Sequence, residues 1–306
     1  MNGSPQSGLV SPPPSNQARP GGQGVAKKWL IIILVLAFAF VLMPFLLWYM
    51  TTFSRPLSSD DMTRFFAPGA RPRDTQHALS RVADEILSLD PGVRASAKQW
   101  YPDVLRAAKL DGDEVRLTAA WVMGQDNTAP DFHAALLDLV HDPNPMVRRN
   151  AALALVRFGD DSGHDTIVSM LAPYHMPAPR AGGLAVRLHP GDAINPGTLL
   201  AHINADGRKT EVRSQVPGTI RAWLVPDGAQ VAAGQPIVLV DSSADVVWEA
   251  LRALYLIGRN DDLPLVTAYA RGVEGMPPNI QEQAKLTLEA IQSRAATPGA
   301  QSASPR

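Results

Sequence analysis

Residues 147–159 read VRRNAALALVRFG, and residues 246–258 read VVWEALRALYLIG, with small and apolar side chains at matching positions. In the first stretch, apolar residues recur at helical spacing from Val147 to Phe158, and Gly159 follows where helices commonly end. Each stretch therefore predicts an amphipathic helix of the same kind.

Helices of this kind begin at four equivalent residues, which are Val115, Val147, Val246 and Ile280. The first two starts, and also the last two, are separated by one period of roughly 33 residues, which is typical of helical repeats. The spacing between Val147 and Val246 equals one such period plus an insert of roughly 66 residues. The sequence thus predicts a helical repeat array that is interrupted by one small domain.

The segments beside these helices also have one apolar side. Residues 131–140 and 166–171 predict partner helices, while residues 75–88 and 93–109 predict earlier helices that match the pattern poorly. Because stacked repeats bury their apolar faces against neighbours, we expect one continuous helical layer in spite of the insert. Three aromatic residues on the apolar stripes are expected in the core: Trp121, Trp248 and Tyr255.

The segment before Val147 reads Asp-Pro-Asn-Pro from residue 142. Asp142 can accept hydrogen bonds from the unpaired N–H groups of a helix start, and each proline suits a first turn. With the residues that follow, this segment resembles a HEAT repeat, and the matching residues are Asp142, Pro143, Pro145, Val147, Arg148, Ala151, Ala152, Leu153 and Gly159. The resemblance covers residues 75–172 and 244–294 and implies an armadillo-type α-solenoid that binds proteins.

The insert has a different periodicity, with short extended runs between glycines and prolines. The predicted strands are residues 184–188, 199–204, 209–215, 219–225 and 236–240. Two halves repeat each other, because Gly191-x-x-Ile194-x-x-Gly197 matches Gly228-x-x-Val231-x-x-Gly234. The glycines permit tight turns and the branched residue points into a core, so the insert is expected to be a small flattened barrel or sandwich.

Residues 216–237, VPGTIRAWLVPDGAQVAAGQPI, resemble the second half of a biotinyl/lipoyl-like (barrel-sandwich hybrid) domain. In that family, a lysine at the tip of the hairpin between the halves carries the cofactor. Here Gly207 occupies the carrier-lysine position, Asn204 replaces the usual acidic residue, and Asp206-Gly207 predicts a two-residue hairpin turn. We therefore expect no cofactor, with Lys209, just beyond the tip, as the alternative attachment point of a biotin or lipoate carrier.

Periplasmic adaptors of efflux and secretion systems also combine a membrane anchor with an unmodified lipoyl-like domain. Those adaptors place a long helical hairpin between the two halves, whereas this chain has only residues 204–216 there. The short link disfavours a full efflux adaptor, and an adaptor-like accessory subunit of a transport or other membrane complex stays as the alternative. The candidate partner-binding residues of the insert are Trp223, Arg221, Arg208 and Lys209.

Trp29 to Met50 forms a long uncharged run that is dominated by Ile, Leu, Val, Phe and Ala. At about 1.5 Å per residue this run can cross a ~30 Å hydrocarbon core, and it is longer than the apolar part of a cleaved signal peptide. Three positive residues precede it and two follow: Arg19, Lys27 and Lys28, then Arg55 and Arg64. We expect a single-pass anchor in a bacterial cytoplasmic (inner) membrane, with an extracytoplasmic soluble body.

The composition indicates no enzyme chemistry. Cysteine is absent, so thiol catalysis and thiolate metal sites are excluded, and a net charge of −1 gives no reason to expect nucleic acid as a partner. Residues 160–165, DDSGHD, contain three carboxylates and a histidine that could hold a metal, but their place after a helix favours capping and a polar turn. No catalytic and no metal-binding residue is predicted.

The sequence therefore predicts an α+β multidomain chain. An α-solenoid of HEAT-like helix pairs is interrupted by a small all-β barrel-sandwich domain, and one transmembrane helix precedes both. The expected segments are a disordered tail at 1–28, the transmembrane helix at 29–50, a linker at 51–74, HEAT-like repeats at 75–175, the β domain at 178–243, further repeats at 244–294 and a disordered tail at 295–306. The expected function is that of a non-catalytic scaffold for a protein partner near the membrane.

Overall fold

The computed structural model describes residues 34–36, 38–40, 42–44 and 57–296. The chain divides into two units, Met1–Pro56 and Leu57–Arg306, and the described residues of the first unit are helical. Within the described ranges, no helix combines the length and the apolar character needed to cross a membrane. The rest of the expected anchor, the tail before it and residues 297–306 lie outside the described residues.

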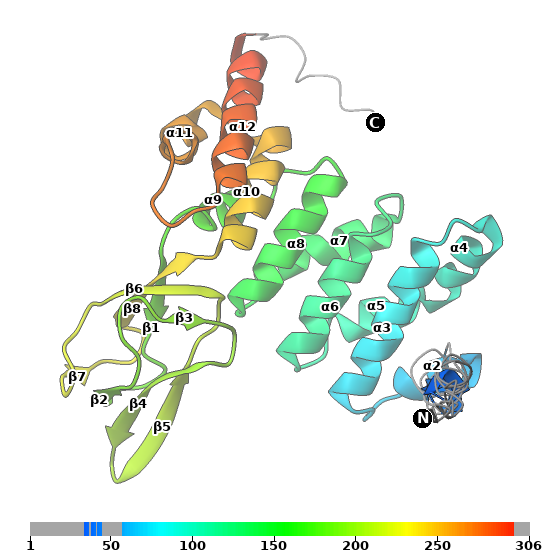
Figure 1. The fold of residues 1–306 in the computed structure, drawn as a ribbon, viewed down its shortest axis with the longest axis horizontal. Coiled ribbons are helices and arrows are strands. Elements are labelled where there is room, and N and C mark those ends of the chain that lie inside the picture. Colours follow the sequence, from blue (N-terminus) through cyan, green and yellow to red (C-terminus); the bar gives the residue numbers. More distant parts are fainter. Residues whose placement is uncertain (1–33, 37, 41, 45–56, 297–306) are drawn as a thin grey trace, which may run out of the picture. The chain divides into compact units, whose positions relative to one another are not determined.

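The second unit is an array of short helices with a β domain to one side, which is inserted between two of the helices in the sequence (Figure 1). The helices are α2 (Ser59–Phe65), α3 (Pro72–Ile86), α4 (Pro91–Ala97), η1 (Lys98–Trp100), α5 (Tyr101–Ala107), α6 (Asp113–Met123), α7 (Pro130–Leu139), α8 (Pro145–Arg157), α9 (His164–Ser169), α10 (Ala244–Ile257), η2 (Asn260–Asp262), α11 (Leu263–Arg271) and α12 (Pro278–Ala296). The four helices expected from the repeat spacing are confirmed as α6, α8, α10 and α12.

The N-terminal part of the array differs in detail from the expectation. Residues 59–65 form α2 within the segment expected to be a linker, where the Ser58 side chain and Asp61 form a capping box. Residues 93–109 are divided among α4, η1 and α5 instead of forming one helix. Proline stands in the first turn of both α4 and α5, which favours new helix starts because proline lacks the N–H that a preceding turn would bind.

The start of α8 corrects the expected role of Asp142. Asn144 is the N-cap residue, and its side chain accepts a hydrogen bond from the N–H of Met146 at 2.8 Å. Asp142 accepts from the N–H of Asn144 at 2.8 Å and binds the Arg116 guanidinium of the preceding repeat at 2.7 and 3.1 Å. This aspartate therefore joins two repeats instead of capping a helix.

The helical array continues across the insert. One core contains buried residues from α2 through α12, and the neighbouring pairs α3 and α6, α6 and α8, α8 and α10, and α10 and α12 are in contact. Three polar contacts join residues 98 positions apart: His164 Nε2 to Asp262 Oδ2 at 2.8 Å, Arg259 Nη2 to Asp161 Oδ2 at 2.5 Å, and Tyr269 Oη to the Leu171 carbonyl at 2.9 Å. The expected continuous layer is confirmed.

Two of the three aromatic residues expected in the helical core are instead on the surface. Trp121 is 45% exposed and Tyr255 is 44% exposed, while Trp248 packs against the core. The expectation was wrong for Trp121 and Tyr255 because each lies on the rim of its apolar stripe, where a neighbouring helix covers only part of the side chain.

The β domain contains two four-stranded antiparallel sheets, in the strand orders β1-β8-β6-β3 and β5-β4-β2-β7. The strands are β1 (Tyr174–Pro177), β2 (Gly182–Val186), β3 (Ala193–Ile194), β4 (Leu199–Ala205), β5 (Arg208–Arg213), β6 (Gly218–Trp223), β7 (Gln230–Val231) and β8 (Pro236–Ser242). The predicted repeat of two halves is confirmed. When the sequence offset between Gly191 and Gly228 is added to the first and last residues of β3 and β4, it gives the first and last residues of β7 and β8. The two-residue strands β3 and β7 and the first strand β1 were not predicted.

The insert is attached at one end of this domain. β1 and β8 pair with Tyr174 opposite Val240, so the chain enters and leaves the domain side by side. The β domain has its own apolar core, to which Met146 at the start of α8 adds a partly buried side chain. The β4–β5 hairpin extends from the domain away from the helices (Figure 1).

Candidate functional site

Four helices on both sides of the insert present one surface, which we call the repeat face. Residues at the same sequence distance after each helix start are equivalent, and the helix starts are Val115, Val147, Val246 and Ile280. Stacked repeats place equivalent residues in rows. The two rows of the repeat face are Trp121, Leu153, Arg252 and Leu286, and Gln125, Arg157, Leu256 and Ala290. Because α6, α8, α10 and α12 pack in that order, the rows continue past the point where the β domain is inserted.

The repeat face mixes large apolar side chains with cations. Trp121, Leu256 and Leu286 are 45%, 59% and 52% exposed, and Arg157 and Arg252 are also exposed. Arg157 Nη1 donates to the side-chain oxygen of Gln125 at 2.9 Å, which connects α8 to α6 across the face. Aromatic residues and arginine are enriched in protein–protein interfaces, so this composition suits protein binding.

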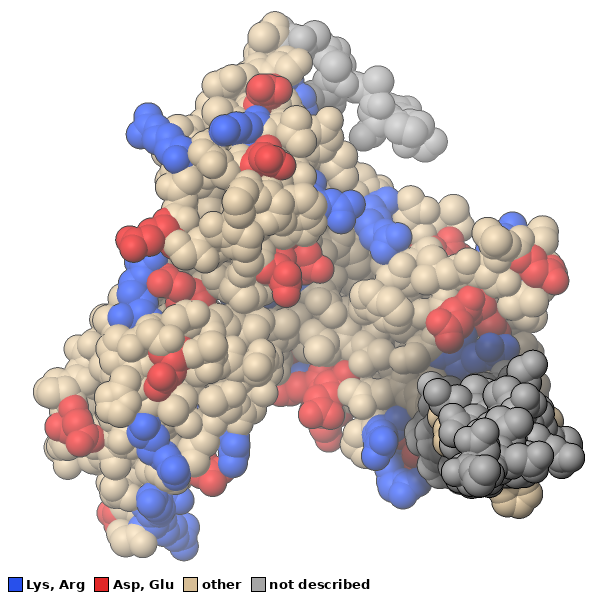
Figure 2. All heavy atoms as spheres, in the orientation of Figure 1, with Lys and Arg blue, Asp and Glu red and all other residues tan. Residues whose placement is uncertain are grey.

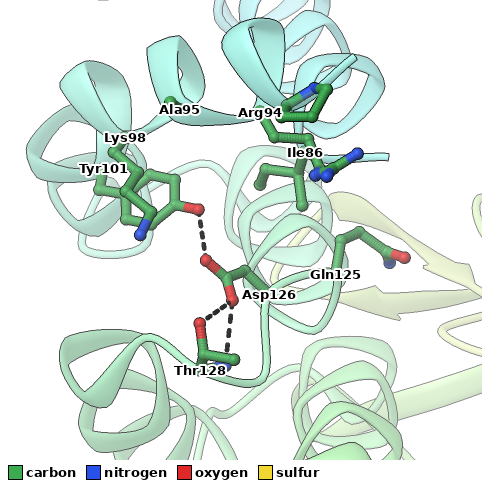
Figure 3. A pocket seen from close by; sticks show the side chains of 9 residues that line it. Ile86, Arg94, Ala95, Lys98, Tyr101, Gln125, Asp126 and Thr128 are labelled. Atoms are coloured by element: carbon green, nitrogen blue, oxygen red, sulfur yellow. Dashed lines mark hydrogen bonds between the residues drawn. The ribbon is translucent and has the colours of Figure 1, made fainter. Parts of the chain in front are cut away.

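A pocket of about 430 Å³ opens near one end of the array, between α3, α4, α5 and the loop after α6 (Figure 3). In it, the Tyr101 hydroxyl donates to Asp126 Oδ2 at 2.6 Å, and Asp126 Oδ1 accepts from the N–H and the hydroxyl of Thr128 at 3.0 and 2.6 Å. Arg94 and Lys98 also line the pocket. Tyr101, Asp126 and Thr128 thus bind each other and connect two repeats.

The electrostatics of this pocket favour a structural pair over an acid–base pair. Burial, followed by the hydrogen bond to Asp126, raises the pKa of Tyr101 well above its usual value, so the phenol stays protonated. Burial acts to raise the pKa of Asp126, but hydrogen bonds from Thr128 and Tyr101 and the charge of Lys98 outweigh it, and the pKa is lowered. The carboxylate therefore stays ionised near neutral pH and holds the phenol as a donor.

The hairpin between the two halves of the β domain has the predicted two-residue turn. Ala205 pairs with Arg208, and Asp206 and Gly207 have positive φ angles of 51° and 69°. This combination is that of a type I′ turn, which glycine adopts without steric cost. Lys209 lies on β5 opposite Asn204 and so is part of the strand, not of the turn.

The four candidate partner-binding residues of the β domain fall into two groups. Arg208 and Lys209 are exposed on β5, where Figure 2 shows Lys and Arg side chains gathered over the hairpin. Arg221 and Trp223 lie on β6 in the other sheet. Arg221 pairs with Asp241 at 2.6 Å, and the Trp223 indole N–H donates to the Leu188 carbonyl at 3.0 Å. The structure therefore does not bring the four residues together.

The acidic segment at residues 160–165 has internal partners. Asp160 accepts from the N–H of Ser162 at 2.7 Å and lies 2.7 Å from His133 Nε2, while Asp161 binds Arg259. Among the described residues, no group of three or more His, Cys, Asp or Glu side chains could hold a metal ion. Their contacts are those of a polar turn that links neighbouring helices.

Two family profiles match parts of this chain. The profile of a family described as HEAT repeats matches residues 102–173, and the profile of a family described as biotin-requiring enzyme matches residues 173–240. The chain thus contains a HEAT-like repeat region followed by a lipoyl-type domain. No curated protein matches it. Among solved structures, the crystal structure of an engineered protein is similar, with 14% identity over 76% of this chain and 88% of that chain and a TM-score of 0.31.

Neither the repeat face nor the pocket was predicted from the sequence. The repeat spacing already aligns Trp121, Arg252 and Leu286, so the repeat face could have been found by following one repeat position along the array. No comparable pattern marks the pair of Tyr101 and Asp126, because these residues belong to different repeats and to no motif.

We predict that Asp126→Asn lowers the free energy of unfolding by about 1–2 kcal/mol at pH 7, because hydrogen bonds to a charged acceptor are lost. Folding lowers the pKa of Asp126, so its contribution is full above the unfolded value of about 3.9 and is lost as the pH falls through the folded value. In urea unfolding, the difference between wild type and variant should shrink from pH 7 to pH 3. Asp131→Asn, at an exposed carboxylate on α7, is the control, and a difference that is equal at both pH values contradicts the prediction.

Proposed function

We propose that this chain is a non-catalytic, membrane-anchored scaffold that binds a protein partner through the repeat face. The observation that carries the proposal is the continuity of this face across the insert. Hydrogen bonds between residues 98 positions apart join the helices before the insert to those after it, so the helical layer can present one long surface. This surface exposes Trp121, Leu256 and Leu286. Large apolar side chains beside Arg157 and Arg252 match the composition of protein-binding surfaces.

The lipoyl-type domain contributes a second, separate surface to the proposed scaffold. Its β4–β5 hairpin extends away from the helices (Figure 1) and carries exposed Arg208 and Lys209 next to its turn. Burial, followed by the charges of Lys209 and Arg187, lowers the pKa of His202, which lies on β4 next to these cations. The proposed role of this hairpin is noncovalent recognition.

The proposed anchor is the uncharged run Trp29–Met50, in a bacterial inner membrane with the soluble body outside the cytoplasm. Among its described residues, Val35 is 61% and Phe40 is 81% exposed, and such apolar surface is favoured in a lipid environment. We predict that the body is digested by protease added to spheroplasts. Digestion that requires disruption of the inner membrane contradicts the proposed orientation.

The binding proposal is tested by a photo-crosslinking residue placed at position 121 or at position 256 in native membranes. We expect both positions to give an adduct with the same partner, because the two residues lie on one face. An equivalent residue at Ala134, exposed on the other helix layer in α7, is the control. Trp121→Ala should weaken binding by about tenfold, since an aromatic anchor contributes about 1–2 kcal/mol. Equal adducts at position 134, or none at positions 121 and 256, would disprove the proposal.

The carrier alternative is tested by the intact mass of the chain from a host that contains active biotin and lipoate ligases. We expect the unmodified mass, because the tip of the hairpin has Gly207 and Lys209 lies within β5. Lys209→Arg serves as the control. An added biotin or lipoate mass that disappears in this variant would establish the carrier function instead.

A further inference from the structure

Arg116 on α6 forms hydrogen bonds both within its own repeat and with the next repeat. Its Nη1 donates to the carbonyl oxygens of Leu110 and Asp111 at 2.9 and 2.8 Å. Its Nε and Nη2 donate to both carboxylate oxygens of Asp142, in the next repeat, at 2.7 and 3.1 Å. The guanidinium therefore has a bidentate carboxylate partner, which is the strongest arrangement for this side chain.

Arg148 is the equivalent residue one repeat later, and it forms only the carbonyl part of this set of hydrogen bonds among the described residues. Its Nη1 donates to the carbonyl oxygens of Asp142 and Pro143 at 2.7 and 2.9 Å, as Arg116 does to the equivalent carbonyls of its own repeat. Two residues are equivalent to Asp142 in the repeat pattern. The sequence offset between Val115 and Val147, added to position 142, gives Tyr174, and the offset between Val147 and Val246 gives Asp241. These two equivalents of Asp142 lie at the two ends of the insert.

Neither residue supplies a carboxylate to Arg148. Tyr174 has no carboxylate, and Asp241 pairs with Arg221 of the β domain at 2.6 Å. In the part of the chain that the structure describes, no Asp or Glu side chain forms an ion pair with Arg148, whose hydrogen bonds are those to the two carbonyls. Among the described residues, Arg148 therefore lacks the carboxylate partner that Arg116 has.

The next residue of α8, Arg149, is a buried cation. Arg149 is 4% exposed. Within the described part of the chain, its side chain donates one hydrogen bond, to the sulfur of Met146 at 3.8 Å. A thioether is a weak acceptor, so the guanidinium lacks an adequate partner. Burial lowers the pKa of Arg149, as expected for a cation that has lost water without gaining an anion.

Tyr174 packs against the core of the β domain, as does Met146, the hydrogen-bond partner of Arg149. Burial raises the pKa of the Tyr174 hydroxyl, whereas the charges of Arg148 and Arg149 act to lower it. The hydroxyl donates to the side-chain oxygen of Gln215 at 2.8 Å, and Gln215 is exposed. The two cations therefore lie at the junction of α8 and β1, with an exposed residue next to them.

We propose that Arg148 and Arg149, with the Tyr174 hydroxyl beside them, bind a carboxylate from an acidic side chain of the protein partner. The source of the carboxylate rests on the proposed function. A carboxylate suits the position because Asp142 fills the equivalent place next to Arg116, with a planar bidentate contact. Two adjacent cations without an internal anion also favour an acidic occupant.

The site is tested by the thermal unfolding of the full chain with disodium glutarate, which carries the carboxylate of a Glu side chain, against sodium chloride of equal ionic strength. We expect glutarate to raise the unfolding midpoint of the wild type. In Arg149→Met the glutarate concentration that gives half of this rise should increase at least tenfold, while Arg73→Met, at an exposed cation on α3, should respond as the wild type does. No rise in the wild type, or an equal rise in Arg149→Met, overturns the proposal, and so does a stronger response to inorganic phosphate than to glutarate.

A second measurement supplies the carboxylate from within the chain. Tyr174→Glu should have a higher unfolding midpoint than Tyr174→Gln, and this difference should disappear when either is combined with Arg149→Met. If Arg149→Met does not fold, Arg149→Lys replaces it, with a smaller difference expected. A difference that is unaffected by position 149 overturns the proposal. A response to glutarate without a crosslinked partner would leave the carboxylate site standing and reject the proposed scaffold function alone.

Discussion

The structure depends on one constraint, which is that a helical repeat must bury its apolar side against a neighbouring repeat. The helices α8 and α9 meet this constraint with α10 and α11, although about 70 residues of β domain lie between them in the sequence. The buried pair of His164 and Asp262 and the bond from Tyr269 to the Leu171 carbonyl fix the register of the two parts. The ends of the insert must then lie side by side, and the pairing of β1 with β8 satisfies this requirement.

The insert consequently adds a module without dividing the helical core, but it changes the contacts at the point of insertion. Asp142 completes the repeat contact before the insert, and Tyr174 and Asp241, at the two ends of the insert, occupy the equivalent positions. The arginines at the junction are left without an internal carboxylate. A site for a partner's carboxylate can therefore arise where a repeat contact has been interrupted, since Arg148 keeps the carbonyl contacts of Arg116 but, among the described residues, lacks its carboxylate partner.

Much of this architecture could be predicted from the sequence, because repeat spacing and turn chemistry are local properties. The long spacing between Val147 and Val246 revealed the insert, and Asp206-Gly207 specified the turn that the hairpin adopts. The exposure of Trp121 could not be predicted in the same way, since it depends on how far a neighbouring helix extends over the apolar stripe. The buried Arg149 was also missed, because a charge next to small apolar residues in a repeat gives no sign of its burial.

The central claim, that the helices on both sides of the insert form one folded unit, is tested most directly by replacing residues 174–240 with a short glycine–serine linker. Tyr174 and Val240 are paired across β1 and β8, so a short linker can join the adjoining residues without moving the helices. We predict that the remaining helical signal in circular dichroism is lost in a single cooperative transition. Separate transitions for the helices before and after the linker, or loss of the helical signal before heating, would contradict it.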